Sequence, residues 1–141
     1  MKSFTRSGKF AAVALSYLAA ENLVNAASSP EDAAAYPDFA WAMANRGGDY
    51  FWRSHKMTTT DGYVLTMFEI TGDVNNQPIQ GQGESGPLLL QHGFSSDSIT
   101  WVNRLTDENE LAIGSQLFED GFSVWFGNIR GTRRSKEHLY L

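Results

Sequence analysis

The residues best suited to chemistry lie at the end of a short apolar run, at Gln91-His92-Gly93-Phe94. The segment from Pro87 to Gly93 is an apolar run bounded by Gly86 and Gly93, and it predicts a strand covered on both faces in a parallel sheet. In such sheets ligands bind beyond the carboxyl ends of the strands, where loops converge. A glycine there lets the backbone turn sharply and approach a ligand closely. Amide groups presented in this way would suit an oxyanion hole, which stabilises the tetrahedral intermediate of acyl transfer.

The nucleophile for such a reaction is not found among the 141 residues. The motif G-x-S-x-G, a strand-to-helix turn that presents a catalytic serine, does not occur. Its nearest approximations are 93–97 and 121–125, which read GFSSD and GFSVW and each lack the second glycine. Neither metal-ligand spacing nor a phosphate-binding glycine loop is present, so we expect no metal ion and no cofactor.

The remaining polar and aromatic candidates are interpreted as structural residues. His55 lies in a predicted strand, as a surface or packing residue, and His138 lies in a charged stretch, where we expect it to be solvated. The basic cluster is interpreted as a solvated loop and not as an anion site; it consists of Arg130, Arg133, Arg134 and Lys136. Trp101 and Trp125 are interpreted as core anchors.

The elements ahead of this site are a helical segment and a hairpin. Residues 28–32 are polar and typical of a helix start, and 37–45 have apolar residues at helical spacing before Arg46-Gly47-Gly48 ends the pattern. Two β-branched runs follow, 54–60 and 63–71, joined by Asp61-Gly62. This dipeptide predicts a tight primed turn with positive φ at both central residues. Residues 73–86 are predicted to form an exposed loop.

The elements that position His92-Gly93 are predicted to be a βαβ unit. After the strand at 87–93, Thr106 or Asn109 is expected to cap a helix that ends at Gly121, and Phe122 to Phe126 is a second buried strand. Strand, helix, strand implies a right-handed crossover and a parallel sheet. The predicted fold class is therefore α/β, a β-hairpin followed by βαβ.

Several of these segments together resemble the acid lipase family, which includes gastric and lysosomal acid lipases. The resemblance rests on LLQHGF at 89–94 with Trp101 after it, on GFSVWFGNIRG at 121–131, and on TDGYVL at 60–65. Arg46-Gly47-Gly48 and the helix before it are similar to the family's N-terminal lead-in. The resemblance covers roughly Pro37 to Leu141.

The resemblance implies an α/β-hydrolase and a role for each matching residue. Phe94 corresponds to the residue whose backbone amide donates to the oxyanion, with His92 and Gly93 supporting its loop. The Phe94 side chain would also shape the acyl pocket. The family's nucleophile, acid and base lie later in the chain, so the resemblance implies that none of the triad is present here. It therefore predicts the incomplete N-terminal part of a longer enzyme.

The N-terminus is predicted to be a secretory signal peptide. Basic residues precede an 11-residue mostly apolar run from Phe10 to Ala20, and Val24-Asn25-Ala26 offers small residues for cleavage. The run is shorter than the roughly 20 residues that span a bilayer, so we expect no transmembrane segment after cleavage. The predicted organisation is a signal at 1–26, a linker at 27–36 and a truncated lipase domain at 37–141.

Composition limits the partners of the mature chain. Removal of 1–26 takes away three basic residues and one acidic one, leaving 8 Lys/Arg against 15 Asp/Glu, which disfavours nucleic acid. The absence of cysteine excludes a small disulfide-stapled domain.

Two functions from different classes follow. The first is a secreted or lysosomal lipase acting on triacylglycerols or sterol esters at a lipid–water interface, the 141 residues themselves being inactive. The alternative is a non-catalytic secreted binding module that retains half of a hydrolase scaffold. A carbohydrate binder ranks below both, because it would need Trp41, Trp52 or Trp101 to be exposed.

Overall fold

A computed structural model describes residues 29–47, 50–73, 83–103 and 111–140. The predicted signal peptide lies outside these residues, as do Thr106, Asn109 and most of the predicted loop at 73–86. Among the described residues, no helix is long and apolar enough to cross a membrane.

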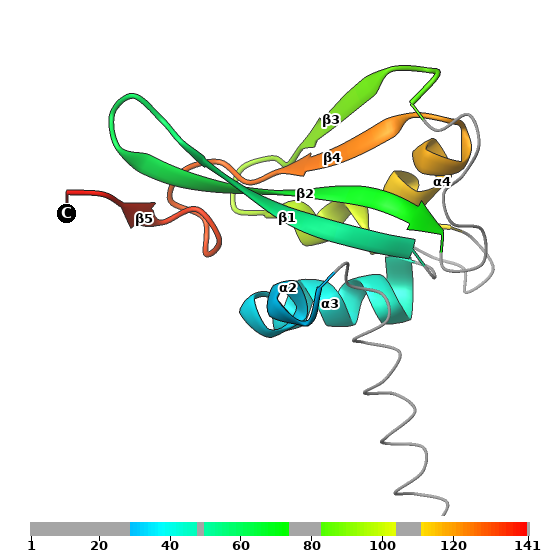
Figure 1. Ribbon diagram of the computed structural model, residues 1–141, viewed down its shortest axis with the longest axis horizontal. Coiled ribbons are helices and arrows are strands. Elements are labelled where there is room, and N and C mark those ends of the chain that lie inside the picture. Colours follow the sequence, from blue (N-terminus) through cyan, green and yellow to red (C-terminus); the bar gives the residue numbers. More distant parts are fainter. Residues whose placement is uncertain (1–28, 48–49, 74–82, 104–110, 141) are drawn as a thin grey trace, which may run out of the picture.

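A mixed sheet forms the centre of the fold (Figure 1). Strand β1 pairs antiparallel with β2, β2 pairs antiparallel with β4, and β4 pairs parallel with β3, while the short β5 pairs with β2. The antiparallel β1–β2 hairpin and the parallel β3–β4 pair together confirm the predicted α/β class. The strands are β1 (Tyr50–Thr58), β2 (Tyr63–Asp73), β3 (Pro87–Gln91), β4 (Ser123–Gly127) and β5 (Glu137–His138).

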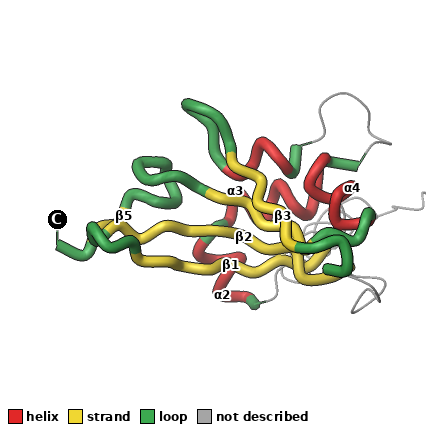
Figure 2. The backbone as a smooth tube through the Cα atoms, turned by 90° about the horizontal axis from the view of Figure 1, so that it is seen from above, coloured by secondary structure: helices red, strands yellow, loops and turns green. Residues whose placement is uncertain are grey.

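The turn of the β1–β2 hairpin differs from the predicted one. Gly62 has a φ of 90°, but Asp61 does not share this left-handed conformation. The Gly62 N–H donates to the carbonyl of Thr59 at 2.9 Å, and the Thr59 N–H donates to the carbonyl of Tyr63 at 2.8 Å. This pattern is a three-residue loop in which an ordinary turn precedes a left-handed glycine, so the prediction of a primed two-residue turn is wrong. Figure 2 shows the hairpin tip beside β5.

Two short helices precede the sheet. Helix α2 (Pro30–Ala35) begins where the sequence predicts a helix start, because the Ser29 hydroxyl accepts a hydrogen bond from the Asp32 N–H at 3.1 Å. It lies within the predicted linker. Helix α3 (Pro37–Ala42) follows after one residue and continues into a π-helical turn, η1 (Met43–Gly47). Both lie on the same side of the sheet (Figure 1).

Aromatic side chains form the core between α3 and one face of the sheet. Phe39 of α3 stacks on Phe68 of β2 with ring centroids 3.8 Å apart, and it forms a T-shaped pair with Trp52 of β1 with ring centroids 4.9 Å apart. All three are fully buried. Along β2, Thr66, Phe68 and Ile70 are buried while the residues between them are half-buried, so one face of the sheet carries the core. Trp52 is thus unavailable for the carbohydrate role.

The crossover between β3 and β4 confirms the predicted βαβ unit. It contains a 3₁₀ turn, η2 (Ser98–Trp101), and helix α4 (Ile113–Glu119). The helix begins later than predicted: its N-cap is Ala112, which has no side-chain capping hydrogen bond, and not Thr106 or Asn109. Helix α4 ends as predicted at Gly121, whose φ is 86°. The Gly121 N–H donates to the Phe118 carbonyl at 3.0 Å and the Phe122 N–H to the Leu117 carbonyl at 3.2 Å, the paired bonds of a glycine-terminated helix.

The environment of β3 corrects the prediction of a strand covered on both faces. Within the described residues β3 is an edge strand, paired only with β4. Leu88 and Leu90 are half-buried, whereas Leu89 points to the opposite face and is 56% exposed. The difference arises because the core cluster places α3 and α4 against one face, and no described element covers Leu89.

Candidate functional site

A cleft of about 630 Å³ lies at the carboxyl ends of β3 and β4. The loop after β3 forms one wall and the loop after β4 forms the other. Its position agrees with the rule that ligands bind where parallel strands end. The lining combines apolar, hydroxyl and charged side chains, among them His92, Phe94, Asp97, Ile99, Ile129 and Arg130.

Phe94 lies on the rim of this cleft and is 99% exposed. The next residue, Ser95, has a φ of 58°. Among described residues other than glycine it alone has positive φ, a conformation that is retained mostly at functional or strained sites. Gly93 has no left-handed φ, and a Cβ atom added there would meet nothing within 4 Å. The sharp turn expected at Gly93 is therefore made at Ser95.

His92 holds the two loops of the cleft together. It is 5% exposed, and its Nε2 accepts a hydrogen bond from the Ile129 N–H at 3.3 Å. Because Nε2 is an acceptor, the ring proton resides on Nδ1, which donates to the Gly93 carbonyl at 2.8 Å. Both ring nitrogens are thus occupied by backbone groups. This geometry suits a support for the loop and not a proton acceptor for a nucleophile.

Asn128 is a second connection between the loops, and its role was not predicted. It is 2% exposed; its Oδ1 accepts from the Ser98 N–H at 3.0 Å, and its Nδ2 donates to the Thr66 carbonyl at 3.1 Å. The Ser135 hydroxyl donates to the Asn128 carbonyl and accepts from the Thr66 N–H, both at 2.9 Å. These buried bonds join the loop after β3 to the middle of the sheet.

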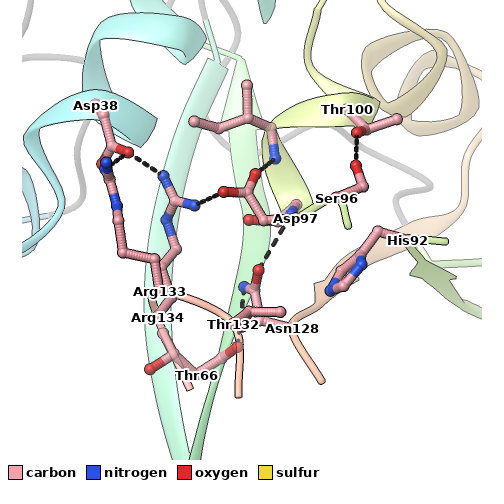
Figure 3. Close-up of polar contacts among 12 residues, drawn as sticks. Asp38, Thr66, His92, Ser96, Asp97, Thr100, Asn128, Thr132, Arg133 and Arg134 are labelled. Carbon is pink, nitrogen blue, oxygen red and sulfur yellow. Dashed lines mark hydrogen bonds and ion pairs between the residues drawn. The ribbon is translucent and has the colours of Figure 1, made fainter. Parts of the chain in front are cut away.

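Arg134 contradicts the interpretation of the basic cluster as a solvated loop. Its side chain is only 3% exposed and forms ion pairs with Asp38 of α3 and Asp97 of the loop after β3 (Figure 3). Arg133 shares Asp38 but is 65% exposed. Neighbouring arginines in the sequence therefore have opposite environments. The sequence signal for Arg134 is weak, because only the tertiary contact with two distant carboxylates identifies it.

Arg130 anchors the hairpin tip to the loop after β4. Its Nη1 lies 2.6 Å from Asp61 Oδ2, and its guanidinium lies 4.8 Å from the ring centre of Tyr63. A hydrogen bond from the Thr59 hydroxyl, followed by the Arg130 interaction, lowers the pKa of Asp61 below its ordinary value of 3.8. Both side chains of the ion pair are about half exposed, so the pair orients the tip more than it stabilises the fold.

The other two histidines lie outside the cleft. His55 Nε2 lies 2.8 Å from Glu69 Oε2 and its ring packs near Trp125, in agreement with a packing residue. His138 is half-buried and not simply solvated: Nε2 bonds to the Asp61 carbonyl at 2.8 Å and its ring packs edge-on to Tyr63. Within the described part of the chain, no group of three or more potential metal ligands occurs.

Comparison with known proteins finds similarity to lipases. Residues 44–105 match the family model described as a partial alpha/beta-hydrolase lipase region. The chain is similar to triacylglycerol lipase 2 of Arabidopsis thaliana, with 38% identity over 65% of the chain and 21% of the relative. It is also similar to gastric triacylglycerol lipase of Bos taurus, with 36% identity over 61% of the chain and 20% of the relative.

A third relative extends this series. Lysosomal acid lipase/cholesteryl ester hydrolase of Rattus norvegicus is 39% identical over 62% of the chain and 21% of its own length. The chain thus spans about a fifth of the length of each relative. Together, the family model, these relatives and the mixed α/β sheet show that the chain contains part of an α/β-hydrolase lipase region and is similar to gastric and lysosomal acid lipases.

Proposed function

We propose that the chain supplies the oxyanion-hole side of a serine lipase that hydrolyses triacylglycerols or sterol esters. The observation that carries this proposal is the placement of Phe94 at the rim of a cleft where two parallel strands end, in a loop tied down by His92. Preorganised amides are the groups that stabilise the anion formed in acyl transfer. Relatives named as lipases support the reaction class.

In this reaction a serine hydroxyl attacks the ester carbonyl and the carbonyl oxygen becomes negatively charged. The Phe94 N–H would donate to that oxygen beside a second amide next to the serine. His92 would fix the loop through its two backbone hydrogen bonds. The serine, its base and its acid would come from a further part of the enzyme, and the reaction requires neither metal ion nor cofactor.

The rim of the cleft suits an apolar acyl chain. The exposed Phe94 side chain lies there together with Ile129, which is 43% exposed. Exposed aromatic and aliphatic side chains beside a cleft are a common feature of ligand-binding grooves. We propose a lipid–water interface as the working environment and secretion or lysosomal delivery as the destination, with the mature chain beginning after Ala26. Sequencing the N-terminus of the secreted product tests that boundary.

The first experiment compares the 141-residue chain with the product of its extended coding sequence. We expect a G-x-S-x-G motif downstream of Leu141, hydrolysis of a medium-chain triacylglycerol by the extended product, and labelling of its serine by a fluorophosphonate. The 141-residue chain should show neither. Termination of the coding sequence at Leu141, with a folded chain that binds lipid or protein without hydrolysis, would favour a binding module.

The second experiment removes the proposed amide donor from the extended product. Phe94→Pro deletes the N–H, whereas the control Phe94→Ala keeps it and removes only the ring. Loss of one oxyanion donor lowers kcat by roughly 100- to 1,000-fold in other enzymes, and we expect this order for Phe94→Pro. Phe94→Ala should mainly raise KM. Equal kcat values in the two variants, with matching thermal melting curves, would exclude the amide role.

A further inference from the structure

The guanidinium group of Arg134 joins three segments that are distant in the sequence. Figure 3 shows it between the carboxylates of Asp38, on α3, and Asp97, on the loop after β3. We propose that Arg134 is a positioning residue for the Phe94 amide, because it clamps the loop that carries this amide to helix α3. The role in catalysis rests on the proposed lipase function, but the clamp itself can be tested without it.

The clamp acts at the exit of the loop. Asp97 Oδ2 pairs with Arg134, and Asp97 Oδ1 accepts a hydrogen bond from the Ile99 N–H at 2.9 Å. One carboxylate therefore connects the guanidinium to the first turn of η2. At the entrance of the loop, His92 is bonded to the Ile129 N–H. Only Gly93 to Ser96 lie between these two attachments, and they include Phe94 and the left-handed Ser95.

The burial of Arg134 fixes the orientation of its guanidinium group. The Arg134 side chain is 3% exposed, against 33% for Asp38 and 27% for Asp97. A buried guanidinium with two carboxylate partners is held in one orientation, because each charged N–H group that points at a carboxylate would have to find another acceptor away from water. Asp38 lies beside Phe39, whose ring packs in the centre of the core. The loop is thus tied to a helix that packs into the core.

Arg133 provides a matched control for the clamp. It carries the same side chain at the adjacent position and also pairs with Asp38. Of the two arginines, Arg134 alone forms an ion pair with Asp97 among the described residues. The Arg133 side chain is 65% exposed. Removal of Arg133 therefore takes away an equal charge without releasing the loop.

The first test measures amide hydrogen exchange at Ser98 and Ile99, whose N–H groups donate to Asn128 and Asp97 at the clamped end of the loop. Arg134→Ala should accelerate exchange at these amides by about 10-fold or more, because the loop then opens locally more often, while exchange in β2 stays unchanged. Arg133→Ala should leave the loop at the wild-type rate. If Arg134→Ala does not fold, Asp97→Asn takes its place, since the asparagine oxygen still accepts from Ile99 N–H but lacks the charge. Wild-type exchange in the folded variant would overturn the clamp.

The second test uses steady-state kinetics of the extended lipase. Displacement of the amide without loss of substrate contacts should lower kcat by roughly 10- to 100-fold with KM nearly unchanged. Arg134→Lys, which keeps the charge but not the two-pronged donor, should recover part of kcat. Faster loop exchange with wild-type kcat would refute the positioning role. A wild-type enzyme without esterase activity would refute the lipase proposal instead, and the exchange data would still decide the clamp.

Discussion

At the scale of single residues, His92 and Arg134 show how the cleft is held in shape by groups that do not react. The imidazole joins two backbone segments and the guanidinium joins two carboxylates. Both imidazole nitrogens are hydrogen-bonded to backbone groups, and a charged guanidinium has no lone pair that could accept a proton. Both side chains instead limit the motion of the loop bearing Phe94, which is how an amide becomes preorganised for a developing charge.

Replacement of His92 tests this view through stability. His92→Ala removes the acceptor of the partly buried Ile129 N–H, and loss of such a hydrogen bond costs about 0.5–1.5 kcal/mol. We expect the free energy of unfolding in urea to fall by that order. His55→Ala serves as the control, because His55 is about one-third exposed and its Glu69 partner can turn to water. Equal losses for the two variants would contradict the proposed connection.

At the scale of elements, helix α4 approaches β4 closely because residue 114 is glycine. A Cβ atom at Gly114 would lie 2.6 Å from Phe126 Cε1 and 3.1 Å from the carbonyl oxygen of Trp101. Gly114→Ala should therefore lower the free energy of unfolding by about 1–3 kcal/mol, the usual cost of overpacking. Gly93→Ala is the matched control, since a Cβ atom added at Gly93 would meet nothing within 4 Å. Thermal melting that is the same for both variants would contradict this packing.

The hairpin tip should respond to acid through Asp61. Its pKa is lowered in the folded chain, so the contribution of its ion pair is complete above the ordinary value of 3.8 and is lost as the pH falls through the lower folded value. We expect the NMR shift of the Asp61 carboxyl carbon to titrate with a midpoint below 3.8. In Asp61→Asn this titration should vanish. A midpoint above 3.8 in the wild type would contradict the Thr59 and Arg130 interactions.

At the scale of the whole molecule, the helices pack on one face of the sheet, and no strand in the described part of the chain pairs with the outer edge of β3. Leu89 is 56% exposed there, and an unpaired apolar strand edge favours association between chains. Leu89→Lys should therefore raise the concentration at which the 141-residue chain stays monomeric in light scattering. Leu139→Lys introduces the same charge at a residue of the same exposure, 56%, away from that edge. An equal gain from both variants would point to net charge and not to the edge.

Local sequence determined the elements of this protein. Period-two patterning, the glycine at the end of α4 and the serine at the start of α2 act over a few residues, so the hairpin, the βαβ unit and both helix boundaries were predictable. The same holds for the motif around His92, whose residue order alone indicates the resemblance to acid lipases. The turn type at Asp61-Gly62 was mistaken because the register of the two strands, and not the dipeptide alone, sets the loop length.

Only the tertiary structure decided which residues hold the site. The partners of Arg134 lie 96 and 37 residues away, and Asn128 bonds to Thr66 across 62 residues. No local pattern records such contacts, and a buried arginine cannot be told from its exposed neighbour by residue type. The exposure of β3 was likewise decided by which elements pack beside it. Segments that are distant in the sequence come into contact only in the folded chain, so the sequence pattern of each segment alone does not determine these interactions.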